Sequence, residues 1–199
     1  MWRFVRGLGG WRDARRSLGR ASELARRTLA DSLEPARRAA ERIAGRPWVT
    51  YLGAGPNEAS ARFGAAKLLE GPQLLGIATN LEEWAHEEYF VTGPGAPVVV
   101  IAPSGASSDR AGEVLAELAF VGADAVLVSD RPPESEAAWI PLAAGLPEEF
   151  SPILAALPLS LLAYFLAESR GKRSYNFASP TAEREHYRTI HRDTRGEPA

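Results

Sequence analysis

The sequence predicts a doubly wound α/β domain, in which helices cover both faces of one parallel sheet. Short apolar stretches alternate with helical patterns along the middle of the chain, and these stretches lack the polar alternation of a half-exposed strand. Near-continuous apolar strands are typical of a parallel sheet that is buried on both faces. Strands that alternate with helices at this spacing favour a doubly wound arrangement.

Five stretches have the β-branched, aromatic and apolar composition of strands. They are RPWVTYLG (46–53), LLGIAT (74–79), APVVVIAP (96–103), ADAVLVS (123–129) and the short AWIPL (138–142). Helical patterns lie at 57–70, 107–122 and 151–171, and a polar and aromatic segment occupies 80–90. Strands joined in this order predict a flavodoxin-like parallel sheet of five strands.

The N-terminal part of the chain predicts a helix outside this repeat. Apolar residues recur at threes and fours between residues 21 and 44, which indicates an amphipathic helix that is interrupted near Pro35. Before it, Gly7, Gly9 and Gly10 predict a loose lead-in.

The C-terminal part contains one very apolar helical stretch and a polar tail. We expect residues 151–171 to pack against the sheet, although Pro158 and Ser160 interrupt them, and to end at Gly171 in a left-handed turn. The tail is aperiodic and predicts irregular structure. The expected divisions are a basic lead-in with a linker helix (1–46), one domain (47–171) and the tail (172–199).

The composition excludes several kinds of site. The chain has no cysteine, which rules out disulfides, thiolate metal ligands and a cysteine nucleophile. Only three histidines occur, so we expect no metal centre, and no motif calls for a cofactor. Apolar runs are broken well before the ~20 residues of a spanning helix, and no secretory apolar region is present. We therefore expect no membrane partner and a cytoplasmic location.

The net charge of −2 hides an uneven distribution along the chain. Residues 1–46 carry twelve arginines against five acids, whereas residues 47–199 carry eleven basic and twenty acidic side chains. The basic part is short for a helix-turn-helix domain and has no basic strand interleaved with aromatics. We interpret it as a solvated helical face and expect no nucleic-acid partner.

A glycine-rich turn, GAGPNE, joins the first predicted strand to its helix. Ligands of open parallel sheets bind beyond the carboxyl ends of the strands, so Gly53, Gly55 and Asn57 are candidate ligand-binding residues. The third glycine of a dinucleotide motif is replaced by Glu58, whose carboxylate disfavours a pyrophosphate. A tight bend with no chemistry is the alternative.

A second candidate loop, APSGASSD, leaves the strand at 96–103 and opens the next helix. Backbone N–H groups and hydroxyls of Ser104, Gly105, Ser107 and Ser108 would lie at the positive end of a helix dipole, where phosphates bind. Ordinary capping by one of the serines explains the same pattern.

Three stretches, taken in order, resemble one known family. LGAGPNEASARFGAAKLLE (52–70), LEEWAHEEYF (81–90) and PVVVIAPSG (97–105) are similar to the SIS (sugar isomerase) domain, most closely the second SIS domain in the isomerase half of glucosamine-6-phosphate synthase. PLSLLAYFLAESRG (158–171) resembles the helix that closes that domain, and the helix at 21–44 resembles the linker before it. The resemblance implies a SIS fold over residues 47–171.

The resemblance also implies three catalytic residues. The family's lysine and proton-transferring glutamate correspond to Lys67 and Glu70, and its ring-opening histidine corresponds to His86, sixteen residues further on. These residue types suit the chemistry, because isomerisation needs a base beside a carbonyl and ring opening needs a group that titrates near neutrality. The alternatives are a surface ion pair and a histidine packed beside Trp84 and Tyr89.

The family's activity implies a substrate and a partner. We predict an aldose–ketose or aminosugar phosphate isomerase or deaminase that acts as a homodimer, or with a separate SIS half, because the family's histidine reaches a neighbouring subunit's site. The chain lacks the family's serine-rich first SIS domain, and no lysine follows Lys172 to form an imine. The alternatives are therefore a non-catalytic sugar-phosphate sensor or scaffold, and the C-terminal half of a split two-SIS protein.

Overall fold

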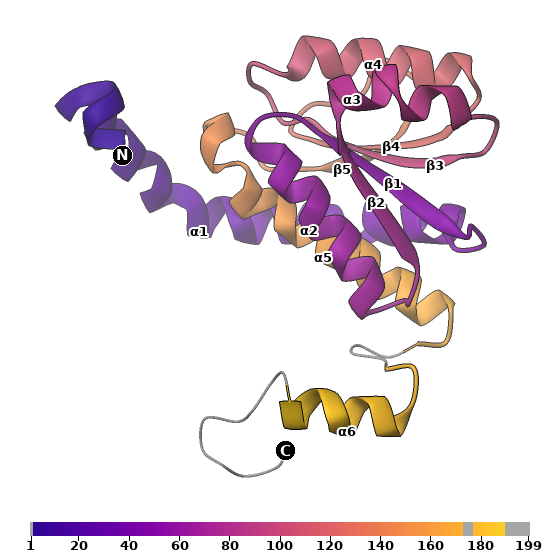
Figure 1. Cartoon of the computed structure of the whole chain (residues 1–199). Helices are drawn as coiled ribbons and strands as arrows, with labels where there is room; N and C mark the ends of the chain where they lie inside the picture. The colour runs from indigo at the N-terminus through magenta and orange to yellow at the C-terminus, as the bar shows by residue number, and fades with distance from the viewer. Residues whose placement is uncertain (1, 173–176, 190–199) are drawn as a thin grey trace.

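The computed structural model describes residues 2–172 and 177–189, and it shows one parallel sheet between two layers of helices (Figure 1). The strands are β1 (Trp48–Gly53), β2 (Leu75–Asn80), β3 (Pro97–Ile101), β4 (Asp124–Ser129) and β5 (Ala138–Pro141). Neighbours pair in parallel in the order β2-β1-β3-β4-β5. The predicted five-stranded, doubly wound sheet is confirmed, and each strand end lies within two residues of its expected place.

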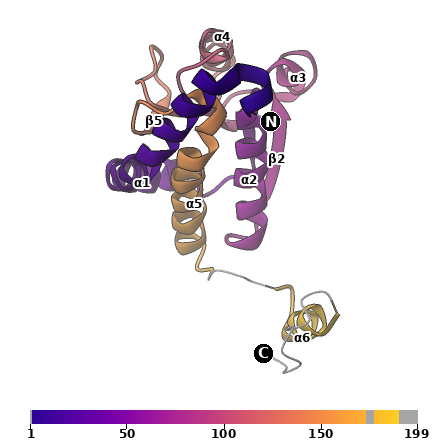
Figure 2. The same cartoon turned by 90° about the vertical axis from the view of Figure 1, so that its left-hand side faces the viewer.

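Helices cover the two faces of the sheet unequally (Figures 1 and 2). On one face, which we call the α5 face, lie α1 (Trp2–Ile43), α2 (Pro56–Glu70) and α5 (Pro152–Ser169). On the other, the α4 face, lie α3 (Leu81–His86), the 3₁₀ helix η1 (Glu88–Val91) and α4 (Ser108–Phe120). A second 3₁₀ helix, η2 (Glu148–Phe150), leads into α5.

Alternate residues of the central strands fill the two cores. Val99 and Ile101 pack with side chains of α1, α2 and α5, whereas Val98 and Val100 pack with side chains of α3 and α4. All four are at most 1% exposed. Successive strand side chains point to opposite faces, so a strand buried on both sides reads as a continuous apolar run.

Helix α1 differs from the predicted lead-in and interrupted linker, because it is continuous through the glycines and through Pro35. A glycine costs a helix interior only about 1 kcal/mol relative to alanine, which does not forbid the helix. Pro35 removes one backbone hydrogen bond. Packing beyond it holds the helix together, since Ala36 and Ile43 are fully buried and the Arg37 guanidinium lies 4.2 Å from the centre of the Phe165 ring.

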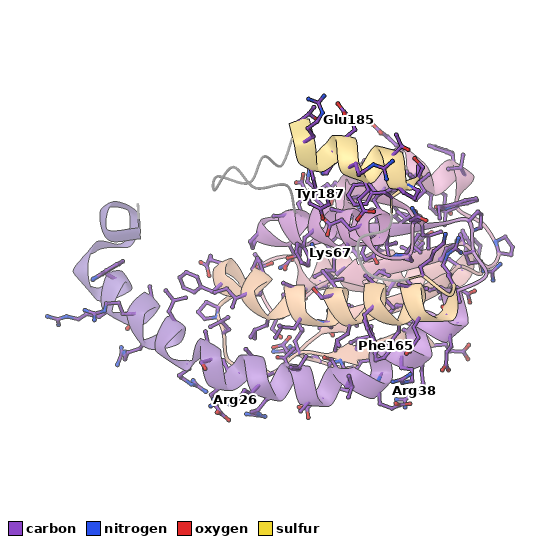
Figure 3. The ribbon with its side chains drawn as sticks, turned by 90° about the horizontal axis from the view of Figure 1, so that it is seen from below. Arg26, Arg38, Lys67, Phe165, Glu185 and Tyr187 are labelled. Carbon is purple, nitrogen blue, oxygen red and sulfur yellow. The ribbon has the colours of Figure 1, made fainter. Side chains whose placement is uncertain are left out.

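Helix α5 lies between α1 and α2, as the view from below shows (Figure 3). The predicted interruptions at Pro158 and Ser160 are absent, and Ser160 donates a hydrogen bond to the Ala156 carbonyl. Gly171 follows the helix with φ of +63°, which confirms the left-handed turn. By length and composition α5 alone among the described helices could span a membrane, but half of it is buried inside the fold, as in a core helix.

The tail is helical where it was expected to be irregular. Helix α6 (Pro180–Thr189) begins after Ser179, whose hydroxyl accepts a hydrogen bond from the Ala182 N–H. Proline in the first turn and a serine cap favour a helix start even in a polar sequence. Residues 173–176 and 190–199 of the predicted tail lie outside the described residues.

Two arginines, one in the last turn of α1 and one just after this helix, bind Asp124 at the start of β4. Arg42 and Arg46 bind the two carboxylate oxygens of Asp124 at 3.0 and 2.8 Å. Burial raises the pKa of Asp124, but the hydrogen bonds from both arginines outweigh burial and lower this pKa below its ordinary value of 3.8. The ion pairs therefore stabilise the fold above about pH 4, and this contribution fades as the pH falls through the lowered pKa.

We predict that Asp124→Asn lowers the free energy of unfolding by about 1 kcal/mol at pH 7, because the hydrogen bonds lose their charge. Urea unfolding of both proteins at pH 7 and pH 3 measures the difference, which should shrink at the lower pH. Glu134→Gln, an exposed carboxylate on a loop, serves as the control and should behave like wild type. A difference that is independent of pH contradicts this role for the ion pairs.

Candidate functional site

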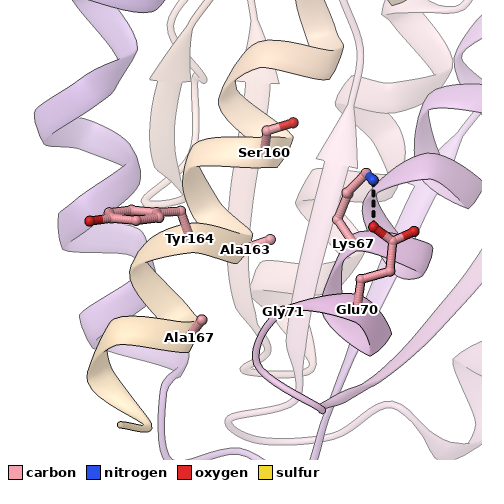
Figure 4. A pocket seen from close by; sticks show the side chains of 7 residues that line it. All are labelled: Lys67, Glu70, Gly71, Ser160, Ala163, Tyr164 and Ala167. Atoms are coloured by element: carbon pink, nitrogen blue, oxygen red, sulfur yellow. Dashed lines mark hydrogen bonds and ion pairs between the residues drawn. The ribbon is translucent and has the colours of Figure 1, made fainter. Parts of the chain in front are cut away.

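Lys67 and Glu70 form an ion pair at the end of α2. The Lys67 Nζ lies 2.5 Å from the Glu70 Oε2, and the side chains are 30% and 42% exposed. Both line a cleft of about 160 Å³ between α2 and α5, where the opposite wall consists of Ser160, Ala163 and other small groups (Figure 4). The carboxylate is thus held by a cation at the mouth of a small cleft, where it remains exposed to solvent.

Small residues line most of the wall opposite the ion pair. Ala163 and Ala167 of α5 face α2, together with Gly71 at the end of that helix, whereas Tyr164 points away from the ion pair (Figure 4). The Lys67 ammonium also lies 5.2 Å from the centre of the Phe63 ring, one turn earlier in α2. These contacts fix the side of the helix to which the Lys67–Glu70 pair points.

His86 lies at the end of α3, on the α4 face of the sheet. Its side chain is 78% exposed, and its Nε2 is 3.9 Å from the Glu82 Oε2. It borders a hollow of about 370 Å³ with residues of η1 and α4. Trp84, not His86, fills the core here, with its ring edge against Tyr89 and its Nε1 donating to the Thr92 hydroxyl. The alternative of a packed histidine therefore does not fit this position.

One chain does not bring Glu70 and His86 together. Helix α2 packs in the α5-face core and α3 in the α4-face core, with the sheet between them. The two residues also lie beyond opposite ends of β2, whose six residues span roughly 17 Å. A site that contains both groups therefore needs a second copy of the chain.

The glycine turn has a structural explanation in this fold. A Cβ at Gly53 would lie 2.1 Å from the Asn57 carbonyl oxygen, so α2 starts where only glycine fits. The Asn57 side chain is fully buried, donates to the Ser151 hydroxyl at 3.0 Å and accepts from Ser60. Gly55 has φ of +53° at the start of the helix. These contacts favour the tight bend over a ligand cradle.

Glu58 keeps a negative charge next to this turn. Hydrogen bonds from Arg62 and then Asn80 lower the pKa of its carboxyl below the ordinary value. A phosphate at the same helix start would meet this carboxylate, so a dinucleotide site is disfavoured.

Two carboxylates from the same chain occupy the donors of the serine loop. Glu148 accepts hydrogen bonds from the Ala106 N–H at 2.7 Å and from the Ser107 hydroxyl at 2.6 Å. A Cβ at Gly105 would lie 2.2 Å from the same carboxylate. Asp130 accepts from both the N–H and the hydroxyl of Ser104.

Gly105 and Ser108 bond to each other within this loop. The Gly105 N–H donates to the Ser108 hydroxyl, which itself donates back to the Gly105 carbonyl. The loop therefore has the composition of an anion cradle, but the anions within it are protein carboxylates.

Sequence reasoning missed Glu148 and Asp130. Asp130 directly follows β4, and the ends of neighbouring parallel strands meet at one edge, so its place beside Ser104 was readable from the strand pattern. Glu148 stands 41 residues beyond Ser107, and no pattern in the sequence connects the two. Within residues 2–172 and 177–189, no group of three or more histidine, aspartate or glutamate side chains is placed to hold a metal ion.

No protein-family model matches the chain, but curated relatives and solved structures do. Glutamine–fructose-6-phosphate aminotransferase (isomerizing) of Pyrobaculum aerophilum is 31% identical over 163 residues, which are 80% of this chain and 27% of the relative. The C-terminal domain of glucosamine-fructose-6-phosphate aminotransferase from Francisella tularensis superposes on 76% of the chain with a TM-score of 0.67, at 23% identity and over 44% of that structure.

The chain is a SIS domain. It is similar to the isomerase part of the aminotransferase, as the order of its motifs implies. A phosphosugar isomerase candidate from Salmonella typhimurium shares the fold over 88% of the chain and 54% of its own length, with a TM-score of 0.74 and 18% identity. An Escherichia coli CFT073 protein, 17% identical with a TM-score of 0.63 over 78% of the chain and 88% of its own length, was solved in complex with a sugar phosphate. The chain spans about a quarter of the length of the curated relatives it matches.

We predict that Glu148→Gln opens the serine loop to anions, because it removes the negative charge without shortening the side chain. Inorganic phosphate should then raise the melting temperature of the variant by roughly 2–4 °C, equivalent to about 1 kcal/mol, with no matching shift in wild type. Differential scanning calorimetry with and without phosphate measures the effect. Glu136→Gln, an exposed carboxylate, is the control. Equal stabilisation of wild type would contradict the occupied loop.

Proposed function

We propose that this SIS domain binds a phosphorylated sugar and isomerises it between its aldose and ketose forms. The observation that carries the proposal is the Lys67–Glu70 ion pair at the α2–α5 cleft, in the place where the resemblance puts the proton-transferring glutamate. The similarity to the isomerase part of the aminotransferase supports this reaction class. Another structure with this fold, at 21% identity and a TM-score of 0.54, is a tagatose-6-phosphate ketose/aldose isomerase from Escherichia coli.

In this proposal Glu70 is the base. It takes a proton from the carbon next to the sugar carbonyl and returns it to the adjacent carbon, through an enediol. Lys67 is the neighbouring cation that positions the carboxylate and offsets the charge that develops on the enediol oxygen. The small side chains across the cleft leave room for an extended, open-chain sugar.

His86 of a neighbouring copy supplies the ring-opening group. Imidazole exchanges protons near neutral pH, which suits transfer between the ring oxygen and the anomeric hydroxyl. Its 78% exposure leaves it free to enter another copy's site. Helices α2 and α3 flank the edge strand β2, so a copy that packs along this edge lies close to both groups.

A non-catalytic sugar-phosphate sensor is the second candidate function. The sequence favours it, because no residue after Lys172 is a lysine that could form an imine with the sugar. Pairing with a separate SIS half also stays a proposal, since the chain spans about a quarter of its curated relatives. The cytoplasmic location stays a prediction.

A mixing experiment tests the shared site. Glu70→Gln and His86→Asn should each lower turnover of the preferred sugar phosphate by roughly 100-fold or more, as loss of a general acid or base does. When the two variants are mixed and allowed to exchange subunits, half of the dimers are hybrid, and each hybrid carries one intact and one doubly defective site. We expect recovery of about a quarter of wild-type activity.

The outcomes separate the candidates. A mixture as inactive as either variant alone contradicts a site shared between copies. Wild type that is stabilised by sugar phosphates but turns none of them over supports the sensor instead. Arg62→Gln, which lies on the same helix outside the cleft, serves as the control and should retain turnover.

A further inference from the structure

The α4 face of the sheet is incompletely covered over β1 and β2. Helix α3 has only six residues, and Trp48, Leu75 and Ile77 are 41%, 55% and 36% exposed on neighbouring strands. We call these three residues the strand patch. On the α5 face β1 is buried, since Val49 and Tyr51 have no exposed surface. A parallel sheet is ordinarily covered by helices on both faces, so this region lacks a helix.

The rim of the strand patch is apolar and acidic. Phe90 and Val91 of η1 and Phe120 of α4 are each more than 80% exposed. Seven acidic side chains lie on α3, η1, α4 and the residue between α3 and η1, whereas the basic side chains there are Arg110 and His86. The acids are Glu82, Glu83, Glu87, Glu88, Asp109, Glu113 and Glu117. The Oε2 atom of Glu88 is shielded from solvent and has no hydrogen-bond partner within the described part of the chain. The surface therefore suits an amphipathic, basic helix.

The first half of α1 is such a helix and is mostly exposed, since only Ala14 among residues 10–23 is buried. We call residues 2–23 the arm, which projects past the sheet (Figure 1). Trp11 and Leu18 lie seven residues apart on one side of the helix and are 43% and 42% exposed. Residues 1–20 carry six arginines and one aspartate. Arg12, Arg15 and Arg20 form no ion pair with any described residue.

The arm of a chain cannot cover its own strand patch. Leu24 is buried in the α5-face core, and the Thr28 hydroxyl accepts a hydrogen bond from the Ala143 N–H at 3.0 Å. The root of the arm is thus fixed on one face of the sheet, and the strand patch lies on the other. The arm is long enough to cover the strand patch of another copy. Its 22 residues span roughly 33 Å as a helix, which is longer than the six-residue strands β1 and β2.

We propose that the arm of one copy packs on the strand patch and acidic rim of a second copy, and that the exchange is reciprocal. Trp11 and Leu18 meet the exposed apolar side chains, and the free arginines meet the glutamates around His86. The arm supplies the helix that this half of the sheet lacks. The inference rests on the self-association in the proposed function, but it needs neither the sugar nor the reaction.

A charge-swap experiment tests the exchange. Arg12→Glu/Arg15→Glu (the arm variant) reverses two charges on the arm, and Glu87→Arg/Glu88→Arg (the rim variant) reverses two charges on the rim. In a dimer of either variant, the substituted residues therefore meet like charges. Each should weaken dimerisation by roughly tenfold or more, as like charges do across an interface. When the two are mixed, both arm–rim contacts become complementary, and we expect heterodimers as stable as the wild-type dimer. Analytical ultracentrifugation with one variant labelled measures this.

Controls separate folding, function and association. Glu134→Arg/Glu136→Arg carries the same charge change on the β4–β5 loop and should not restore the stability of heterodimers with the arm variant. Leu18→Glu should give folded monomers with wild-type circular dichroism. Glu70→Gln should remain dimeric. If this variant loses turnover but keeps the dimer, the result bears on the proposed function and not on the arm exchange. A wild-type chain that is monomeric at micromolar concentration overturns the proposal, as does a dimer that Leu18→Glu and the charge swaps leave unchanged.

Discussion

The sheet that organises this domain also divides its candidate chemistry. A right-handed crossover places α2 on one face and the next connection, α3, on the other, so the ion-paired Glu70 and the exposed His86 lie in different layers. No side-chain rotation brings the two groups together through a packed core. Every functional statement about a shared site therefore depends on how a second chain approaches, and in the proposed function self-association is part of the chemistry.

The internal carboxylates set a second constraint, on the substrate phosphate. A loop of serines at the start of α4 suits phosphate in composition, yet Glu148 and Asp130 already accept its hydrogen bonds. Placing a dianion beside these carboxylates costs electrostatic energy that the loop's neutral donors do not offset.

The fold could be read from the sequence because its signals are local and repeated. Apolar runs such as PVVVI mark strands buried on both sides, and the glycine after α5 has the predicted left-handed conformation. One error occurred where tertiary packing overrides local preference, and the other where a local capping signal was missed. Helix α1 continues through Pro35 because buried alanines beyond it hold the helix, and a serine cap starts α6 in a sequence with no apolar period.

The candidate site was only partly readable. Lys67 and Glu70 lie on one helix face, as their spacing of three predicts. The sequence left open whether they form an ion pair, and the structure shows this pair at a cleft. Glu148 reaches the serine loop from far along the chain, and contacts of that kind carry no sequence signature. The catalytic roles of Lys67, Glu70 and His86 stay predictions.

A crystal structure of the protein with an open-chain sugar phosphate alcohol, which binds like the substrate but lacks the carbonyl, is the most direct measurement. The shared site predicts the alcohol in the α2–α5 cleft, with Glu70 beside its first two carbons and the imidazole of a second copy's His86 at the far side. A sugar phosphate enclosed by one chain alone, or bound away from Glu70, would contradict it.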